Sequence, residues 1–173
     1  KGSALVFQKG GGGGSTHLFE GTATKNFNLT INNNSIPITP DASGKWFYDT
    51  DEKITDLYHA FYDQSSVTSV DLSNIDLTDI PTDYMFFGTS NITSIKFNNT
   101  KSMKLVDVNA MFHGCKSLVS LDLGNWNTSQ LENADHLFAF CSSLTSLDLS
   151  SFDTSQLKDA SYLFGFCSKL VSL

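Results

Sequence analysis

Hydrophobic positions recur along this chain at a nearly constant interval. Five phenylalanines are separated by 25, 26, 26 and 26 residues, at Phe61, Phe86, Phe112, Phe138 and Phe164. An aliphatic residue stands six positions and again nine positions after each of them, and Leu or Phe stands eleven positions after the first four. Agreement at several positions over several units is typical of repeat proteins, in which equivalent residues of neighbouring units contact each other.

Each unit combines two patterns of apolar residues. VTSVDLS (67–73) and its counterparts alternate apolar and polar residues, which predicts a short strand with one buried face. DLYHAF (56–61) and its counterparts space apolar residues by three or four positions after an Asp or Asn, which predicts a short helix with an N-cap. In the second unit Pro81 takes the cap position, so that helix is expected to start differently. One strand and one helix per unit bury a core only when units stack.

The sequence therefore predicts an α/β repeat solenoid of the leucine-rich type. It would have a parallel β-sheet face, short helices on the opposite side and an irregular N-terminal cap. Residues 51–173 are assigned to the solenoid, about four and a half coils that stop within a repeat, and 25–50 to the cap. Residues 1–24 contain five consecutive glycines and are interpreted as a flexible segment or an artificial joint.

Composition narrows the class of partner. The chain has 11 Lys, no Arg and 18 Asp or Glu, which gives a net charge of −7. A nucleic-acid reader needs a basic face, and an acidic protein is repelled by anionic lipid, so neither partner is expected. No apolar run has the length of a membrane span, so direct membrane insertion is not expected either. No cofactor or metal is predicted, and the fragment is expected to be monomeric.

The exposed face of the predicted strands carries the candidate binding residues. Serine and a charged residue recur there in the first four units and form a regular array of hydroxyls and charges. Three interpretations are open: a solvated face, a ligand-binding surface, and a Ca²⁺ site, which the single Asp per unit supports least. The predicted ligand-facing residues are Ser69, Asp71, Ser94, Lys96, Ser120, Asp122, Ser146 and Asp148.

Cysteines accompany the phenylalanines in the predicted core. Cys115, Cys141 and Cys167 each follow their Phe by three positions, and this spacing of 26 does not match a zinc knuckle. We predict buried free thiols that complete the core ladder, with one disulfide-bonded pair as the alternative and metal binding or chemistry least favoured. Trp126 and Phe152 occupy equivalent positions and are assigned to the core, with a sugar-binding platform as the alternative.

No spacing of His, Ser, Cys and carboxylates suggests a catalytic triad. His59 and His136 share a position in the repeat but lie three units apart, and His113 is shifted from it. No catalytic residue is therefore assigned, and the chain is not expected to be an enzyme.

The pattern CxSLxSLDLSxFDTSxLxxAxxLFxxC resembles the leucine-rich repeats of BspA-like bacterial surface proteins, as found in lactobacilli and mycoplasmas. The resemblance covers about 54–173 and is strongest over 112–173. It implies an extracellular protein, on the bacterial cell surface or secreted, that mediates adhesion or recognition of a host protein, matrix protein or glycan. The alternative role is a structural spacer that presents another domain. One departure is that Ile75, Thr100, Trp126 and Phe152 stand where the usual pattern has Asn.

Overall fold

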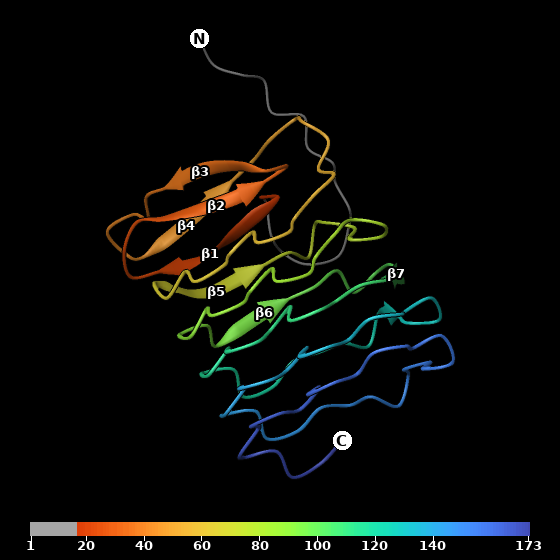
Figure 1. The fold of residues 1–173 in the computed structure, drawn as a ribbon. Coiled ribbons are helices and arrows are strands. Elements are labelled where there is room, and N and C mark those ends of the chain that lie inside the picture. The colour runs from red at the N-terminus through yellow and green to blue at the C-terminus, as the bar shows by residue number, and fades with distance from the viewer. Residues whose placement is uncertain (1–16) are drawn as a thin grey trace.

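The computed structural model describes residues 17–173, so residues 1–16 of the segment assigned to 1–24, with its glycine run, lie outside this range. The described strands form a four-stranded sheet of order β4-β1-β5-β6 and two smaller pairs, β2-β3 and β7-β8 (Figure 1). The strands are β1 (Phe19–Ala23), β2 (Phe27–Ile31), β3 (Asn34–Ile38), β4 (Lys45–Tyr48), β5 (Val67–Asp71), β6 (Ser94–Lys96), β7 (Met103–Lys104) and β8 (Trp126–Asn127).

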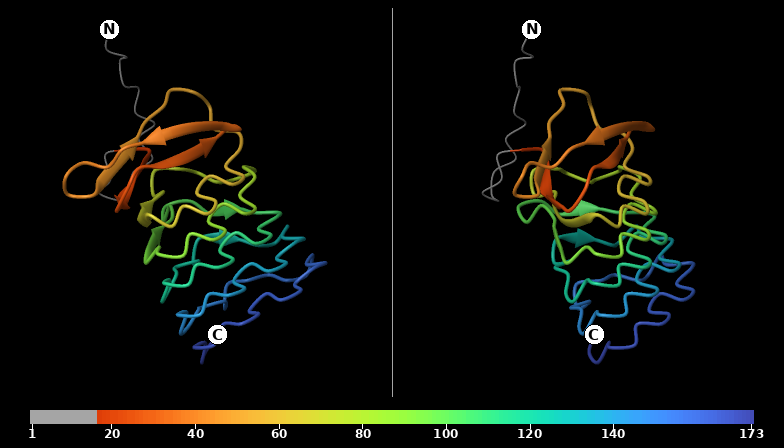
Figure 2. Two further views of the ribbon diagram at one scale, coloured as in Figure 1. Left: turned by 60° about the vertical axis from the view of Figure 1, so that its left-hand side comes forward. Right: turned by 90° about the vertical axis from the view of Figure 1, so that its left-hand side faces the viewer.

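The N-terminal strands gather at one end of the molecule and cover the first repeat unit (Figure 2). β1 pairs antiparallel with β4 on one side and with β5 on the other. The β2-β3 hairpin turns through Asn32 and Asn33, both in the left-handed conformation that such tight turns favour. The N–H groups of Thr30 and Asn32 donate to the carbonyls of Ala60 and Asp56. The cap therefore includes β1, which lies before the boundary predicted at residue 25.

The segments predicted as helices are tight turns, and no helix occurs in residues 17–173. In the first unit the N–H groups of Ala60, Tyr62 and Gln64 donate to the carbonyl three residues earlier. The intervening N–H groups point to the next unit instead: Phe61 N donates to Met85 O at 2.7 Å. An α-helix would direct every N–H to the carbonyl four residues earlier. Each of these segments is thus a run of turns that also pairs with its neighbour.

Left-handed backbone conformations explain why these segments cannot be helical. The residue two before the core Phe has a positive φ in every unit, as in His59 and Tyr84, and so does the residue two after it. At the second position Gly88 and Gly114 stand in two units, where this conformation costs little. A right-handed helix does not continue through a left-handed residue, so the apolar spacing of three to four is satisfied by consecutive turns.

The predicted fold class is therefore wrong. The described chain is all-β, whereas an α/β leucine-rich solenoid requires helices on the side opposite its sheet. The parallel sheet is also much smaller than predicted, because parallel pairing is limited to β5 with β6, β7 with β8 and isolated bridges such as Ser146 with Ser172. The hydrogen bonds between successive turn segments take over the pairing that a continuous sheet would have supplied.

The core consists of columns of equivalent side chains from successive units. Neighbouring rings of the five repeated phenylalanines lie 5.1–5.8 Å apart and within 10° of parallel. The first four rings are fully buried, and Phe164 is partly buried. Trp126 is also buried, stacked between Phe112 and Phe152, which agrees with its assignment to the core. Spacing in the sequence thus correctly indicated which residues contact each other.

The cysteines form a second column beside the phenylalanines, and all three are free thiols. The Sγ of Cys141 donates to the carbonyl of Phe112 at 3.1 Å, and the other two make the same contact one unit away in each direction. In the second unit Thr89 replaces Cys, and its Oγ1 donates to Phe61 O at 2.6 Å. Burial raises the pKa of each thiol, so these cysteines are protonated donors at neutral pH.

Candidate functional site

An open groove of about 970 Å³ lies over the outward face of the four-stranded sheet. It is formed where the cap meets the first two repeat units, and residues of β1, β4, β5 and β6 line it. Thr39, Pro40 and Asp41 from the β3–β4 connection line it as well. Asp41 is held by the loop itself, since its Oδ1 accepts hydrogen bonds from Ser43 and from the backbone N–H of Lys45.

Strand register arranges the outward side chains in two rows across the sheet. In the first row Phe47 lies opposite Glu20, Glu20 opposite Asp71, and Asp71 opposite Lys96. The second row follows the same strands and consists of Lys45, Thr22, Ser69 and Ser94. Because strands lie about 4.8 Å apart, each row extends over roughly 14 Å.

One end of the first row is aromatic. The ring of Phe47 is 59% exposed although it belongs to a strand, and the imidazole of His17 stacks on it at 3.9 Å. His17 is held in place by a hydrogen bond with Asp49, with 2.7 Å between Nδ1 and Oδ2. The same carboxylate accepts a hydrogen bond from the backbone N–H of Leu18. The groove therefore has a supported apolar ring at its rim.

The middle of the groove combines negative charge with hydroxyl groups. Glu20 and Asp71 lie directly opposite each other on neighbouring antiparallel strands, an arrangement that disfavours two like charges. Neither forms an ion pair in the part of the chain that the structure describes. Beside them the hydroxyl of Thr22 is hydrogen bonded to those of Thr68 and Ser69, at 2.7 and 2.8 Å. The groove thus offers hydrogen-bonding groups, both signs of charge and one exposed ring.

The structure divides the eight predicted ligand-facing residues into two sets. Ser69, Asp71, Ser94 and Lys96 come together in the groove. The other four are exposed in the later units and do not line it: Ser120, Asp122, Ser146 and Asp148. A ligand-binding role stays a prediction for both sets.

The aspartates of these strands also stabilise the turns that follow them. Asp71, Asp122 and Asp148 each accept a hydrogen bond from the backbone N–H two residues later. Hydrogen bonds from the hydroxyl and N–H of Ser150 lower the pKa of Asp148. This local role explains why Asp recurs at this position independently of any ligand.

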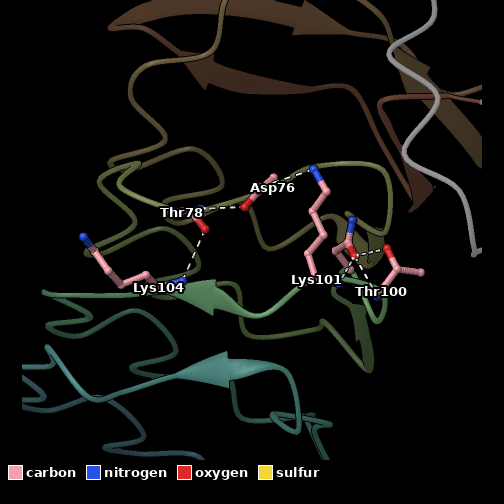
Figure 3. Close-up of polar contacts among 6 residues, drawn as sticks. Asp76, Thr78, Thr100, Lys101 and Lys104 are labelled. Carbon is pink, nitrogen blue, oxygen red and sulfur yellow. Dashed lines mark hydrogen bonds and ion pairs between the residues drawn. The ribbon is translucent and has the colours of Figure 1, made fainter.

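The loop edge of the units is a less suitable site, because its polar groups bind one another. Figure 3 shows Asp76 accepting hydrogen bonds from the backbone of Thr78 and from Lys101. The backbone N–H of Lys104 donates to the Thr78 hydroxyl, as Figure 3 also shows. The ammonium group of Lys104 lies 3.0 Å from the carboxylate of Asp79. These contacts join the first unit to the second and leave few groups directed at a partner.

The sequence did not predict the groove residues that the cap contributes. Glu20, Thr22, Lys45 and Phe47 lie outside the repeat, and they reach the groove only through antiparallel pairing across long stretches of chain. The only available signal was the aromatic cluster at 46–48, of which Trp46 is buried and Phe47 exposed.

Comparison with known proteins gives one match. Residues 55–172, just over two thirds of the chain, match the family model described as Mycoplasma protein of unknown function, DUF285. Neither a curated protein nor a solved structure matches. Within residues 17–173, no helix has the length and hydrophobicity needed to cross a membrane. The same residues contain no group of three His, Cys, Asp or Glu side chains placed to hold a metal ion.

Proposed function

We propose that this chain, which belongs to the bacterial family described as Mycoplasma protein of unknown function, DUF285, is a non-catalytic recognition module of the bacterial surface. Its role would be adhesion to, or recognition of, a host protein, matrix protein or glycan. The resemblance of its repeats to those of BspA-like surface proteins supports this role, as does a family that includes bacterial proteins. The groove over the four-stranded sheet is the proposed binding site.

The observation that carries the proposal is the pair of side-chain rows across this sheet. A recognition surface needs hydrogen-bonding and charged groups for specificity and an apolar anchor for affinity. The first row supplies Phe47 as the anchor and Glu20, Asp71 and Lys96 as charges, and the second supplies three hydroxyls. Backbone pairing fixes both rows before a partner arrives, which lowers the entropy lost on binding.

A binding array tests the proposal. The purified protein is applied to immobilised matrix proteins, mucin and glycans, and the affinity for the best ligand is measured for variants. Phe47→Ser and Lys96→Gln should each weaken binding about tenfold, as expected for an apolar anchor and for a charged contact of a recognition surface. Phe140→Ser and Lys116→Gln are matched controls, because both residues are exposed and lie outside the groove.

Two results would contradict the proposal. Binding that is lost equally in the groove variants and in their controls would place the site elsewhere. A protein that binds nothing on the array, while a neighbouring domain of a longer chain does, would support the spacer role. Circular dichroism of each variant shows that the fold is retained.

A further inference from the structure

A second surface runs along the turn segments and shares no residue with the groove. These segments place ten aromatic or imidazole rings on the outside of the stacked units, where they are partly or largely exposed. The rings contact each other from the first unit to the fifth: Tyr62 stacks on Phe87 at 5.0 Å, and Phe87 on His113 at 4.3 Å. The aromatic strip consists of Tyr58, His59, Tyr62, Tyr84, Phe87, His113, His136, Phe140, Tyr162 and Phe166.

The core does not require these rings to be aromatic. At the position of Tyr62 and Phe87 the fourth unit has Ala139, and at the position of Tyr84 the third unit has Ala110, with the turns unchanged. Where Ala139 replaces a ring, Phe140 beside it is 39% exposed and contacts His113 at 5.2 Å. The ring contacts thus continue past Ala139 through Phe140, which occupies the next position of the repeat. A continuous exposed aromatic surface is characteristic of a protein–protein contact.

The charge of the strip indicates the partner. The turn segments contain six aspartates and no lysine, although the chain has 11 lysines. The five segments are 56–64, 81–89, 107–115, 133–141 and 159–167, and their aspartates are Asp56, Asp63, Asp83, Asp107, Asp135 and Asp159. Burial raises the pKa of Asp83, and a cation beside it would favour its charged form.

Three other occupants fit this surface less well. A second copy of the chain would bring the same negative charge to the contact, and anionic lipid would be repelled in the same way. A sugar ring packs on an open aromatic face, but the stacked rings of Tyr62, Phe87 and His113 cover one another's faces and leave their edges exposed. Lysine and arginine side chains fit both features, because their methylene stems pack on apolar edges while their charged ends reach carboxylates.

We propose that the aromatic strip docks a lysine- or arginine-rich protein segment in extended conformation. Four intervals of about 5 Å separate the first unit from the fifth, so the strip is about 20 Å long, which an extended segment of roughly six residues spans. The strip is independent of the groove, so either proposal can fail alone.

Titration with labelled peptides tests the proposal. The probes are an octa-arginine, an octa-lysine and an octa-glutamate peptide, and fluorescence anisotropy is measured at physiological salt. Both cationic peptides should bind and the acidic one should not. Phe140→Ser removes an exposed ring without changing charge and should weaken binding at least about threefold. Phe47→Ser is the matched control, since Phe47 is exposed in the groove, and it should change the affinity less than twofold.

Charge variants distinguish a defined site from general attraction to an acidic protein. Asp83→Asn on the strip should weaken binding several-fold more than Asp122→Asn, which makes the same change on the sheet face. Equal effects of these two variants, or an unaltered affinity of Phe140→Ser, would overturn the proposal. So would NMR shift changes that map to the groove, binding to phosphatidylglycerol vesicles, or a dimer in ultracentrifugation that Phe140→Ser dissociates.

Discussion

Truncation of one ring in the phenylalanine column tests the physical basis of the fold. Phe138 is fully buried, and its ring lies between those of Phe112 and Phe164, at 5.5 and 5.8 Å and within 7° of parallel. Its backbone N–H also donates to Leu163 O, so Phe138→Ala leaves the turn pairing in place and removes only the side chain. The cavity opens between two neighbouring rings of the column.

The expected loss in free energy of unfolding is about 3–5 kcal/mol, the usual range for truncating a buried Phe to Ala. Two ring contacts are lost with the side chain, each worth about 0.5–1.5 kcal/mol beyond its buried area. This places the expected value in the upper half of the range. A domain of this size is stabilised by about 5–15 kcal/mol in total, so the variant should unfold at a much lower urea concentration.

Urea denaturation followed by circular dichroism measures this loss. Phe166→Ala is the matched control, because it makes the same chemical change at a ring that is 67% exposed and that, within residues 17–173, stacks only on Phe140. Its cost should be below about 1 kcal/mol. If both variants lose the same small amount of stability, the phenylalanine column does not stabilise the core. The assignment of inward and outward positions would then be refuted.

Three further predictions concern the cysteine column and the histidines. Cys141→Thr should be more stable than the isosteric Cys141→Val by about 1 kcal/mol in urea melts, because only Thr donates to Phe112 O as Thr89 does to Phe61 O. In the native protein Cys115 and Cys141 should resist a thiol reagent that modifies Cys167 sooner, and equal rates would contradict their burial. Burial lowers the pKa of His59 and His113 below the ordinary value of 6.5, so the unfolded chain takes up protons first and stability should fall as pH drops below about 6.5. His113→Phe, which copies Phe87, should reduce this loss between pH 7 and pH 5, and an unchanged loss would show that His113 does not contribute.

The contacts between equivalent residues of neighbouring units follow from the sequence, because they depend only on the repeat interval. Residues 25 or 26 positions apart contact each other whatever backbone conformation connects them, so the phenylalanine column and the buried cysteines were predictable. The prediction of helices was wrong, because apolar residues spaced three to four positions apart fit consecutive turns as well as a helical turn. The deciding feature is the left-handed backbone at residues such as His59 and Tyr84, and residue types that favour this conformation stand only at Asp63, Gly88 and Gly114 in the turn segments.

Only some of the groove residues could likewise be predicted from the sequence. Ser69 and Lys96 were predictable as outward residues because strand alternation fixes the direction of a side chain. Their neighbours Glu20 and Phe47 reach the site through pairing between the cap and the first unit, and this pairing has no period that a sequence pattern can reveal. The aromatic strip was hidden for a related reason, since its rings occupy different positions in different units.

The two proposed surfaces differ in how they depend on the number of units, and this difference can be tested. Deleting residues 113–138 joins Phe112 to Ala139 and removes one unit while keeping every remaining residue in its repeat position. The groove involves only the cap and the first two units, so its ligand should bind with unchanged affinity. The strip loses two of its ten rings, so binding of the cationic peptides should weaken. Deleting only residues 113–125 is the control, because it places unlike positions side by side and should prevent folding of the units that follow. If the full-unit deletion abolishes binding in the groove while circular dichroism shows the fold intact, the groove cannot be a property of the cap and first units, and its assignment would have to be abandoned.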